Sequence, residues 1–140
     1  MAIHFHEKEV SVGIKNKNLL KKHLKDLIVQ EHASPGQINI VFTTDSNVLE
    51  LNKKYLSRDY LTDIITFDYS DNQAIAGDLF ISITRVKENS ESFDVTFNKE
   101  LKRVIVHGIL HLLGYGDRTE TEKTLMRQME DRYLLDSPEI

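Results

Sequence analysis

The chain has 140 residues, of which 40% are hydrophobic and 29% are charged, a balance that suits one folded domain. Its net charge of −4 argues against a generally basic nucleic-acid binder, and the absence of cysteine excludes disulfides and thiolate metal sites. No signal peptide begins the chain and no apolar run approaches the ~18 residues of a membrane span, so we expect a cytoplasmic protein without membrane contact.

The first half of the chain predicts two strands, each followed by a helix. Residues 3–6 alternate in polarity as a half-buried strand does, and residues 16–33 carry apolar side chains at helical spacing. A serine, a proline and a glycine then break the helix before a second strand over 37–44. Asp45 is predicted to cap a further helix through 46–56, because a carboxylate can accept the unpaired N–H groups of a first turn.

The middle of the chain predicts a hairpin and a short helix. Residues 63–69 and 77–83 are two apolar segments joined by a polar loop, which is typical of antiparallel strands. A short helix is expected over 84–92. The earlier strands are joined through helices and can therefore run parallel, so the sheet is expected to be mixed.

The last part of the chain predicts a buried central helix and a terminal one. Asn98 is predicted to cap an almost wholly apolar helix through 99–113, and Gly114 to end it, because glycine adopts the left-handed conformation at low cost. A final helix covers about 119–135. The order predicts an α+β (α/β-like) single domain over residues 1–140, with a small mixed four-stranded sheet packed with about five helices.

The stretch HGILHLLGYGD, residues 107–117, has the spacing of a metal site. His107 and His111 share one helix face, and two imidazoles at this separation can bind one metal ion. The reversal expected at Gly114 would bring Asp117 back beside the helix end as a third ligand. Three protein ligands leave one position open, as in catalytic zinc sites. We predict one metal at the C-terminal end of the central helix, with zinc ahead of nickel, cobalt or iron. The alternative is two hydrogen-bonded core histidines beside an ordinary glycine cap.

This spacing matches the metzincin peptidase pattern H-E-x-x-H-x-x-G-x-x-H, with two differences. Asp117 replaces the last histidine, and Gly108 stands where those enzymes carry their glutamate base. The missing base disfavours peptide hydrolysis by that route. Phosphodiester cleavage is less affected, because a metal itself lowers the pKa of bound water and polarises a phosphoryl oxygen.

Three segments resemble the YbeY family of bacterial endoribonucleases, also called rRNA maturation factors. The stretch HGILHLLGY (107–115) resembles the family signature. The stretch LNKKYLSRDYLTDIITF (51–67) is similar to its Leu-Asn-x-x-Tyr … Thr-Asp-Val-Leu-Ser-Phe segment, and GDLFIS (77–82) to its Gly-Asp-Ile strand. Size and element order also fit, so the resemblance covers nearly the whole chain.

The resemblance implies a single-strand-specific, zinc-dependent endoribonuclease with one Zn²⁺ per chain. It further implies a role in ribosomal RNA processing, small-subunit maturation and ribosome quality control. RNA is then the expected partner, with the ribosomal small subunit or its proteins as a second one, and no DNA is expected. Two alternatives stay open: a non-catalytic ribosome-associated factor stabilised by its metal, and a metallopeptidase.

Two positions depart from the family pattern. The family usually ends its motif Gly-Tyr-Asp-His, with the third histidine as ligand, whereas this chain has Asp117 there. The family also usually places an arginine directly after the tyrosine of Leu-Asn-x-x-Tyr, where this chain has Leu56. Arg58 is the nearest candidate to contact phosphate bidentately, and we predict it as the catalytic residue. Arg58 could instead pair with Asp59 or stay solvated.

Positive charge is concentrated in the first half of the chain. Residues 1–60 hold 9 Lys/Arg against 7 Asp/Glu, whereas residues 61–140 hold 9 against 15. We therefore expect a basic surface, formed by helix 16–33 and Arg58, to border the metal cleft and hold RNA. The alternative for this helix is a solvated face without function.

Overall fold

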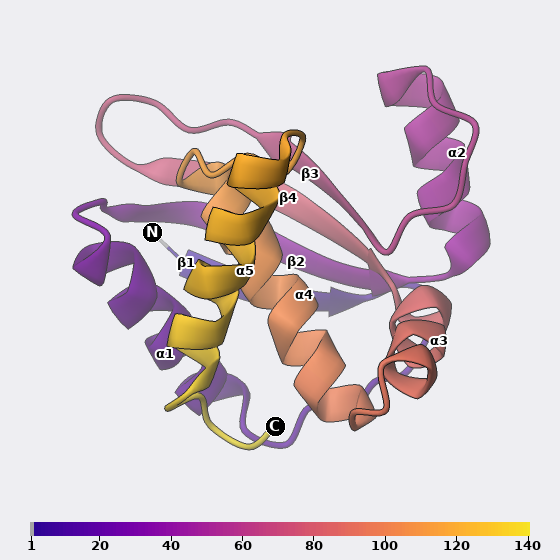
Figure 1. The fold of residues 1–140 in the computed structure, drawn as a ribbon, viewed down its shortest axis with the longest axis horizontal. Coiled ribbons are helices and arrows are strands. Elements are labelled where there is room, and N and C mark those ends of the chain that lie inside the picture. Colours follow the sequence, from indigo (N-terminus) through magenta and orange to yellow (C-terminus); the bar gives the residue numbers. More distant parts are fainter. Residues whose placement is uncertain (1) are drawn as a thin grey trace.

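The computed structural model describes residues 2–140 as a four-stranded mixed sheet with five helices (Figure 1), which confirms the expected α+β class. The elements in chain order are β1 (Ala2–Glu7), α1 (Lys17–Gln30), β2 (Pro35–Thr43), α2 (Asp45–Leu56), β3 (Ile64–Asp68), β4 (Ile75–Ser82), α3 (Ile83–Ser92), α4 (Phe97–Leu112) and α5 (Glu120–Leu134).

The strands lie in the order β1-β2-β4-β3. The β1–β2 and β2–β4 pairs are parallel, and each connection passes through a helix, as parallel pairing requires. The β3–β4 pair is antiparallel and is joined by a short loop, so the predicted hairpin is confirmed. This topology leaves β3 at the edge of the sheet, where its side chains are free to form the wall of a cavity.

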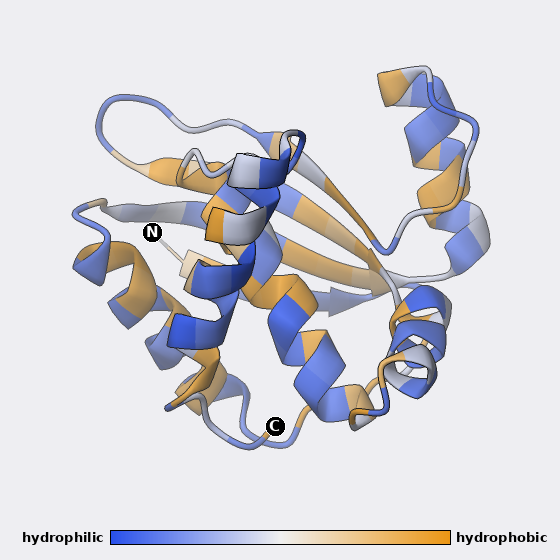
Figure 2. Ribbon diagram, in the orientation of Figure 1, coloured by the Kyte–Doolittle hydropathy of each residue, from blue (hydrophilic) through white to orange (hydrophobic). Residues whose placement is uncertain are grey.

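Helix α4 crosses the sheet at the centre of the molecule, with α5 beside it (Figure 1). Its residues Leu101, Ile105 and Ile109 are wholly buried, and Figure 2 shows the apolar stretches of α4 and of the strands. A Cβ atom at Gly108 would lie 2.8 Å from the end methyl groups of Ile64 and Leu79. Glycine at this position therefore permits the close packing of α4 on β3 and β4. A glutamate there would meet the core rather than the metal centre.

Two helix caps differ from the sequence prediction. Helix α4 begins earlier than expected, with the Thr96 hydroxyl as its N-cap, while the Asn98 amide donates to the Ile140 carbonyl at 2.8 Å. Helix α2 is capped by the Thr44 hydroxyl, whereas the Asp45 carboxylate pairs with an arginine of α3 at 2.9 Å. Both predicted caps were wrong because a long-range partner holds each side chain and the preceding threonine takes the cap.

The C-terminal part of the chain packs beside the central helix. Helix α5 begins at a capping box in which the Thr119 hydroxyl accepts from the Glu122 N–H and the Glu122 carboxylate accepts from the Thr119 N–H. The segment after α5 returns toward the start of α1, where the Asn16 amide donates to the Glu139 carbonyl at 2.7 Å.

Within residues 2–140 no helix has both the length and the apolar character that crossing a bilayer requires.

Candidate metal centre

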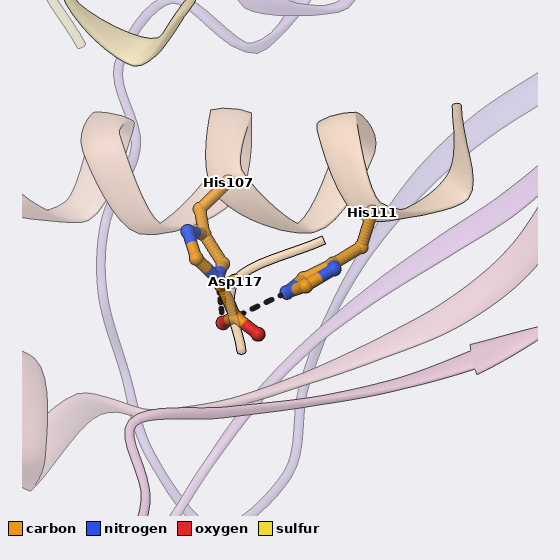
Figure 3. Close-up of side chains that lie close together, drawn as sticks. All are labelled: His107, His111 and Asp117. Atoms are coloured by element: carbon orange, nitrogen blue, oxygen red, sulfur yellow. Dashed lines mark hydrogen bonds and ion pairs between the residues drawn. The ribbon is translucent and has the colours of Figure 1, made fainter. Parts of the chain in front are cut away.

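Two histidines project from one face of α4. His107 and His111 lie one turn apart, and their side chains are 21% and 26% exposed. Their ring centroids are 4.5 Å apart with an interplanar angle of 84°. Figure 3 shows both rings directed toward Asp117, so the structure brings together the three residues that the spacing singled out.

The end of α4 returns the chain toward these histidines. Gly114 has a φ of +102°, and its N–H donates to the His111 carbonyl at 3.0 Å. The Tyr115 N–H donates to the Leu110 carbonyl at 3.0 Å, which completes a Schellman motif. The predicted role of Gly114 is confirmed, and the reversal that it allows carries Asp117 to the histidine face.

Two of the three donor separations match those of a tetrahedral site. Oδ2 of Asp117 lies 3.3 Å from Nε2 of His111 and 3.4 Å from Nε2 of His107. In a tetrahedral zinc site with bonds of ~2.0–2.1 Å, two donor atoms are separated by about 3.4 Å. The three ligand atoms all lie within 4.8 Å of one another, so the donor set can hold one ion.

Hydrogen bonds on the far side of each ring fix which nitrogen faces the centre. Nδ1 of His107 lies 2.7 Å from an oxygen of Glu130, and Nδ1 of His111 lies 2.9 Å from the carbonyl oxygen of Tyr115. A carbonyl and a carboxylate can only accept, so each Nδ1 carries a hydrogen, and in the neutral ring each Nε2 presents its lone pair. Three electron-rich atoms then face one point, an arrangement that is costly without a cation or a proton between them.

The pKa shifts of Glu130 and the two histidines agree with this hydrogen bonding. Burial opposes the charge of Glu130, but hydrogen bonds from His107 and Arg103 outweigh it and hold the pKa of Glu130 below its ordinary value. Burial also opposes protonation of His107, yet Glu130 outweighs it and raises the pKa of His107. Burial and then the neighbouring His107 lower the pKa of His111. Of the two rings, His111 is thus the one that loses its proton more readily.

Glu130 is a functional candidate that the sequence analysis missed. It lies on α5, 23 residues after His107, and is 5% exposed. Arg103 pairs with its other oxygen at 2.9 Å, so the buried carboxylate is compensated on both sides. No local spacing relates Glu130 to the metal motif, because only the packing of α5 on α4 brings the two together.

We expect Glu130→Gln to weaken zinc binding by about 10- to 100-fold, the usual effect of losing a carboxylate that orients a metal-bound histidine. The measurement is competition for zinc against a chromophoric chelator. Asp131→Asn is the matched control, because Asp131 also pairs with Arg103, at 2.7 Å, but is 60% exposed and has no contact with His107. Equal zinc affinities for Glu130→Gln and the wild type would contradict an orienting role.

The metal centre opens into a cavity of about 870 Å³. The predicted catalytic residue Arg58 lies on its wall, as do Leu56, at the position of the family arginine, and Arg118, which the sequence analysis did not single out. The remaining wall comes mainly from the segment through β3 and from the start of α5: Asn52, Tyr60, Thr62, Asp63, Ile64, Ile65, Thr66, Asp68, Gly116 and Glu122.

The expected contribution of helix α1 to this cavity is wrong. Among the described residues, those that line the cavity include none from 16–33. The C-terminal end of α1 packs instead against the loop after α4, with Glu31 accepting from the Tyr115 hydroxyl at 2.5 Å. Positive charge at the cavity therefore comes from Arg58 and Arg118 and not from the lysine-rich helix.

Asn52 holds the loop that carries Arg58. The side-chain amide of this buried residue donates to the Tyr60 carbonyl at 2.9 Å. Its main-chain carbonyl accepts from the Arg58 N–H at 3.1 Å. Asp59 pairs with Lys53 at 3.3 Å and not with its neighbour Arg58. The Arg58 guanidinium is thus not paired with Asp59, the alternative left open from sequence.

Comparisons with known proteins place the chain in a family. The family model described as Endoribonuclease YbeY matches residues 2–137. A Flavobacterium psychrophilum protein named endoribonuclease YbeY is 44% identical over 126 residues, 90% of this chain and 90% of that protein. A Parabacteroides distasonis protein of the same name is 40% identical over 139 residues, covering 99% of this chain and 98% of that protein.

The fold also has a solved counterpart. A solution structure from Thermotoga maritima has a TM-score of 0.68 and 28% identity, and it covers 94% of this chain and 86% of that one. The expectation drawn from the histidine signature and the Leu-Asn-x-x-Tyr segment is therefore confirmed. On the family match and the two near-full-length relatives, this chain belongs to the endoribonuclease YbeY family.

Proposed function

We propose that residues 1–140 form one zinc-dependent domain that cleaves single-stranded ribosomal RNA. The observation that carries this proposal is the convergence of His107, His111 and Asp117 on one point in a cavity that also contains Arg58. The name of the relatives, endoribonuclease YbeY, supports it. We further propose a role in small-subunit maturation and ribosome quality control in the cytoplasm, with the small subunit or its proteins as partners.

His107, His111 and Asp117 would hold the metal, and the mixture of imidazole and carboxylate favours zinc. Bound zinc supplies a Lewis acid that polarises a phosphodiester and makes water more acidic. The Asp117 side chain is 43% exposed, and its Oδ2 atom is the oxygen that lies next to the two histidine rings (Figure 3). Its second oxygen, or solvent, is thus available to accept a proton during cleavage.

Arg58 would contact the phosphate. A guanidinium can donate two parallel hydrogen bonds to phosphate oxygens, and this stabilises the negative charge that develops during cleavage. The cavity volume of about 870 Å³ lies within the range of small-molecule sites, so it can hold the nucleotides that flank one bond. The fixed loop around Asn52 would keep the arginine in place.

The proposed activity is tested with a labelled single-stranded RNA and the same RNA in a duplex. Purified protein should cleave the single strand, should spare the duplex, and should lose activity when a chelator removes zinc and regain it when zinc returns. His111→Ala should be inactive. A wild-type protein that binds zinc without cleaving RNA would instead support the non-catalytic ribosome-associated factor.

The packing around Gly108 counts against the metallopeptidase alternative. A glutamate at this position would have to displace the end methyl groups of Ile64 and Leu79, and its side chain would start from the core rather than from the metal centre. We therefore expect no digestion of casein under conditions in which RNA is cleaved.

Arg58→Ala should weaken binding of single-stranded RNA by about 10-fold or more, because a hydrogen bond to a charged group contributes roughly 1.5–3 kcal/mol. Binding is measured by fluorescence anisotropy on zinc-free protein, so that the RNA is bound without being cleaved. Wild-type binding should also weaken as salt rises, since phosphate contacts release counterions.

Lys22→Ala is the matched control for this loss of charge. Lys22 lies on α1, is 74% exposed and does not line the cavity, so its replacement should leave binding almost unchanged. A larger loss for Lys22→Ala than for Arg58→Ala would place the RNA on α1 instead. A wild-type affinity independent of salt would argue against phosphate contacts altogether.

A further inference from the structure

A partly buried hydrogen-bond cluster lies behind the metal centre and joins three separate parts of the chain. The carboxylate of Glu31, at the C-terminal end of α1, accepts from the Tyr115 hydroxyl at 2.5 Å through one oxygen. Its other oxygen accepts from the Tyr133 hydroxyl of α5. These partners are 84 and 102 residues away from Glu31 in sequence. We call Glu31, Tyr115 and Tyr133 the Glu31 cluster.

Tyr115 connects this cluster to the metal centre. Its N–H bonds to the Leu110 carbonyl at 3.0 Å, its own carbonyl accepts from Nδ1 of His111 at 2.9 Å, and its hydroxyl bonds to Glu31. The residue is thus held at three points. A carboxylate can only accept, so the Tyr115 hydroxyl is the donor in its bond to Glu31.

The tautomer of His111 depends on this carbonyl. With the hydrogen on Nδ1, the Tyr115 carbonyl is satisfied and Nε2 offers its lone pair to a metal. With the hydrogen on Nε2, the ring would donate to the Asp117 oxygen 3.3 Å away, and the metal-binding nitrogen would be blocked. His107 has no such ambiguity, because the buried Glu130 carboxylate accepts from its Nδ1.

We infer that Glu31 is a positioning residue for the metal centre, acting through Tyr115. By holding the Tyr115 hydroxyl, Glu31 keeps the Tyr115 carbonyl in line with Nδ1 of His111 and so selects the tautomer that presents Nε2. The inference rests on the proposed function only in assigning His111 as a metal ligand. Tyr133 shares the Glu31 carboxylate, but its hydroxyl reaches His111 only through Glu31 and Tyr115, whereas the main chain of Tyr115 contacts His111 directly.

Two variants separate positioning from general stability. Tyr115→Phe and Tyr133→Phe each remove one hydroxyl donor from the same carboxylate. Tyr115→Phe keeps the carbonyl that bonds to His111 but releases it from Glu31, so zinc binding should weaken by about 10-fold, the lower end of the effect of disturbing a ligand's hydrogen-bond partner. Tyr133→Phe should stay within about 2-fold of the wild type. The affinities come from chelator competition, and melting temperatures check that both variants are folded.

A double-mutant cycle tests whether Glu31 acts through Tyr115. Glu31→Ala alone should weaken zinc binding about as much as Tyr115→Phe, and the double variant should lose no more than either single one. Additive losses, or a Tyr115→Phe affinity equal to that of the wild type, would overturn the inference.

The ¹⁵N chemical shifts of histidine give a readout that does not need the metal. In metal-free protein at a pH where His111 is neutral, its Nδ1–H tautomer should dominate in the wild type and in Tyr133→Phe, and should lose population in Tyr115→Phe and Glu31→Ala. An unchanged tautomer in the last two variants would refute the positioning role. If the wild type bound no zinc, the metal assignment would fail, and these shifts would still decide what Glu31 does.

Discussion

Replacing His107 with alanine is expected to abolish stable zinc binding and to lower RNA cleavage by at least about 1,000-fold. The change removes one of three protein ligands, and Lewis-acid catalysis by a bound metal contributes several kcal/mol to a transition state. The fold should survive, because Arg103 still compensates the buried Glu130 carboxylate at 2.9 Å. Elemental analysis of the purified protein measures zinc content, and a single-turnover assay measures the cleavage rate. Circular dichroism measures whether the fold is kept.

His6→Ala is the control for loss of a histidine. His6 lies on β1, is exposed, and its ring bonds to Asn39 at 3.1 Å, far from the metal motif, so this variant should keep both zinc and activity. A His107→Ala protein that retained a full equivalent of zinc would show that the ligands are elsewhere. Retained cleavage without zinc would show that the reaction does not need this centre.

The second large effect concerns the residue that departs from the family pattern. Asp117→Ala should lose most of its zinc and slow cleavage by about 100-fold or more, because it removes the oxygen that lies 3.3–3.4 Å from both Nε2 atoms. Asp117→His should keep zinc and cleave RNA at an equal or higher rate at neutral pH. Imidazole in place of carboxylate removes one negative charge from the ligands, so the metal becomes a stronger Lewis acid.

Zinc content and pH–rate profiles of the two variants are the measurements, and Asp136→His, at an exposed position after α5, is the control for the substitution itself. If Asp117→His bound zinc normally but no longer cleaved RNA, Asp117 would be the proton acceptor and more than a ligand. The Asp117 side chain is 43% exposed, so the larger imidazole has room to enter.

The core of the metal centre could be predicted from sequence because its geometry is local. The i, i+4 spacing places His107 and His111 on one helix face whatever surrounds the helix. A glycine three residues after the second histidine ends the helix by a known reversal, which the φ of +102° at Gly114 bears out. Short-range backbone geometry thus brings Asp117 to the histidines without help from the rest of the fold.

Helices and strands could be predicted because their patterns are local in sequence. The residues that cap the helices could not be predicted as well. Hydrophobic periodicity marks the buried face of α4, and it depends only on neighbours along the chain. Asn98 and Asp45 are both good capping residues by type, yet each is held by a partner 42 and 40 residues away, respectively. A polar side chain that could cap a helix forms its hydrogen bond elsewhere when the packed structure places another partner within reach.

What the sequence alone determined is therefore the family, the order of the elements and the three converging side chains. Tertiary structure alone decided that Glu130 and Glu31 support the centre, that the lysine-rich face of α1 lies away from the cavity, and that Gly108 is needed for packing. The physical reason is distance along the chain. Local conformational preferences act over a few residues, whereas these contacts join segments 23 to 102 residues apart, which meet only when helices pack on the sheet.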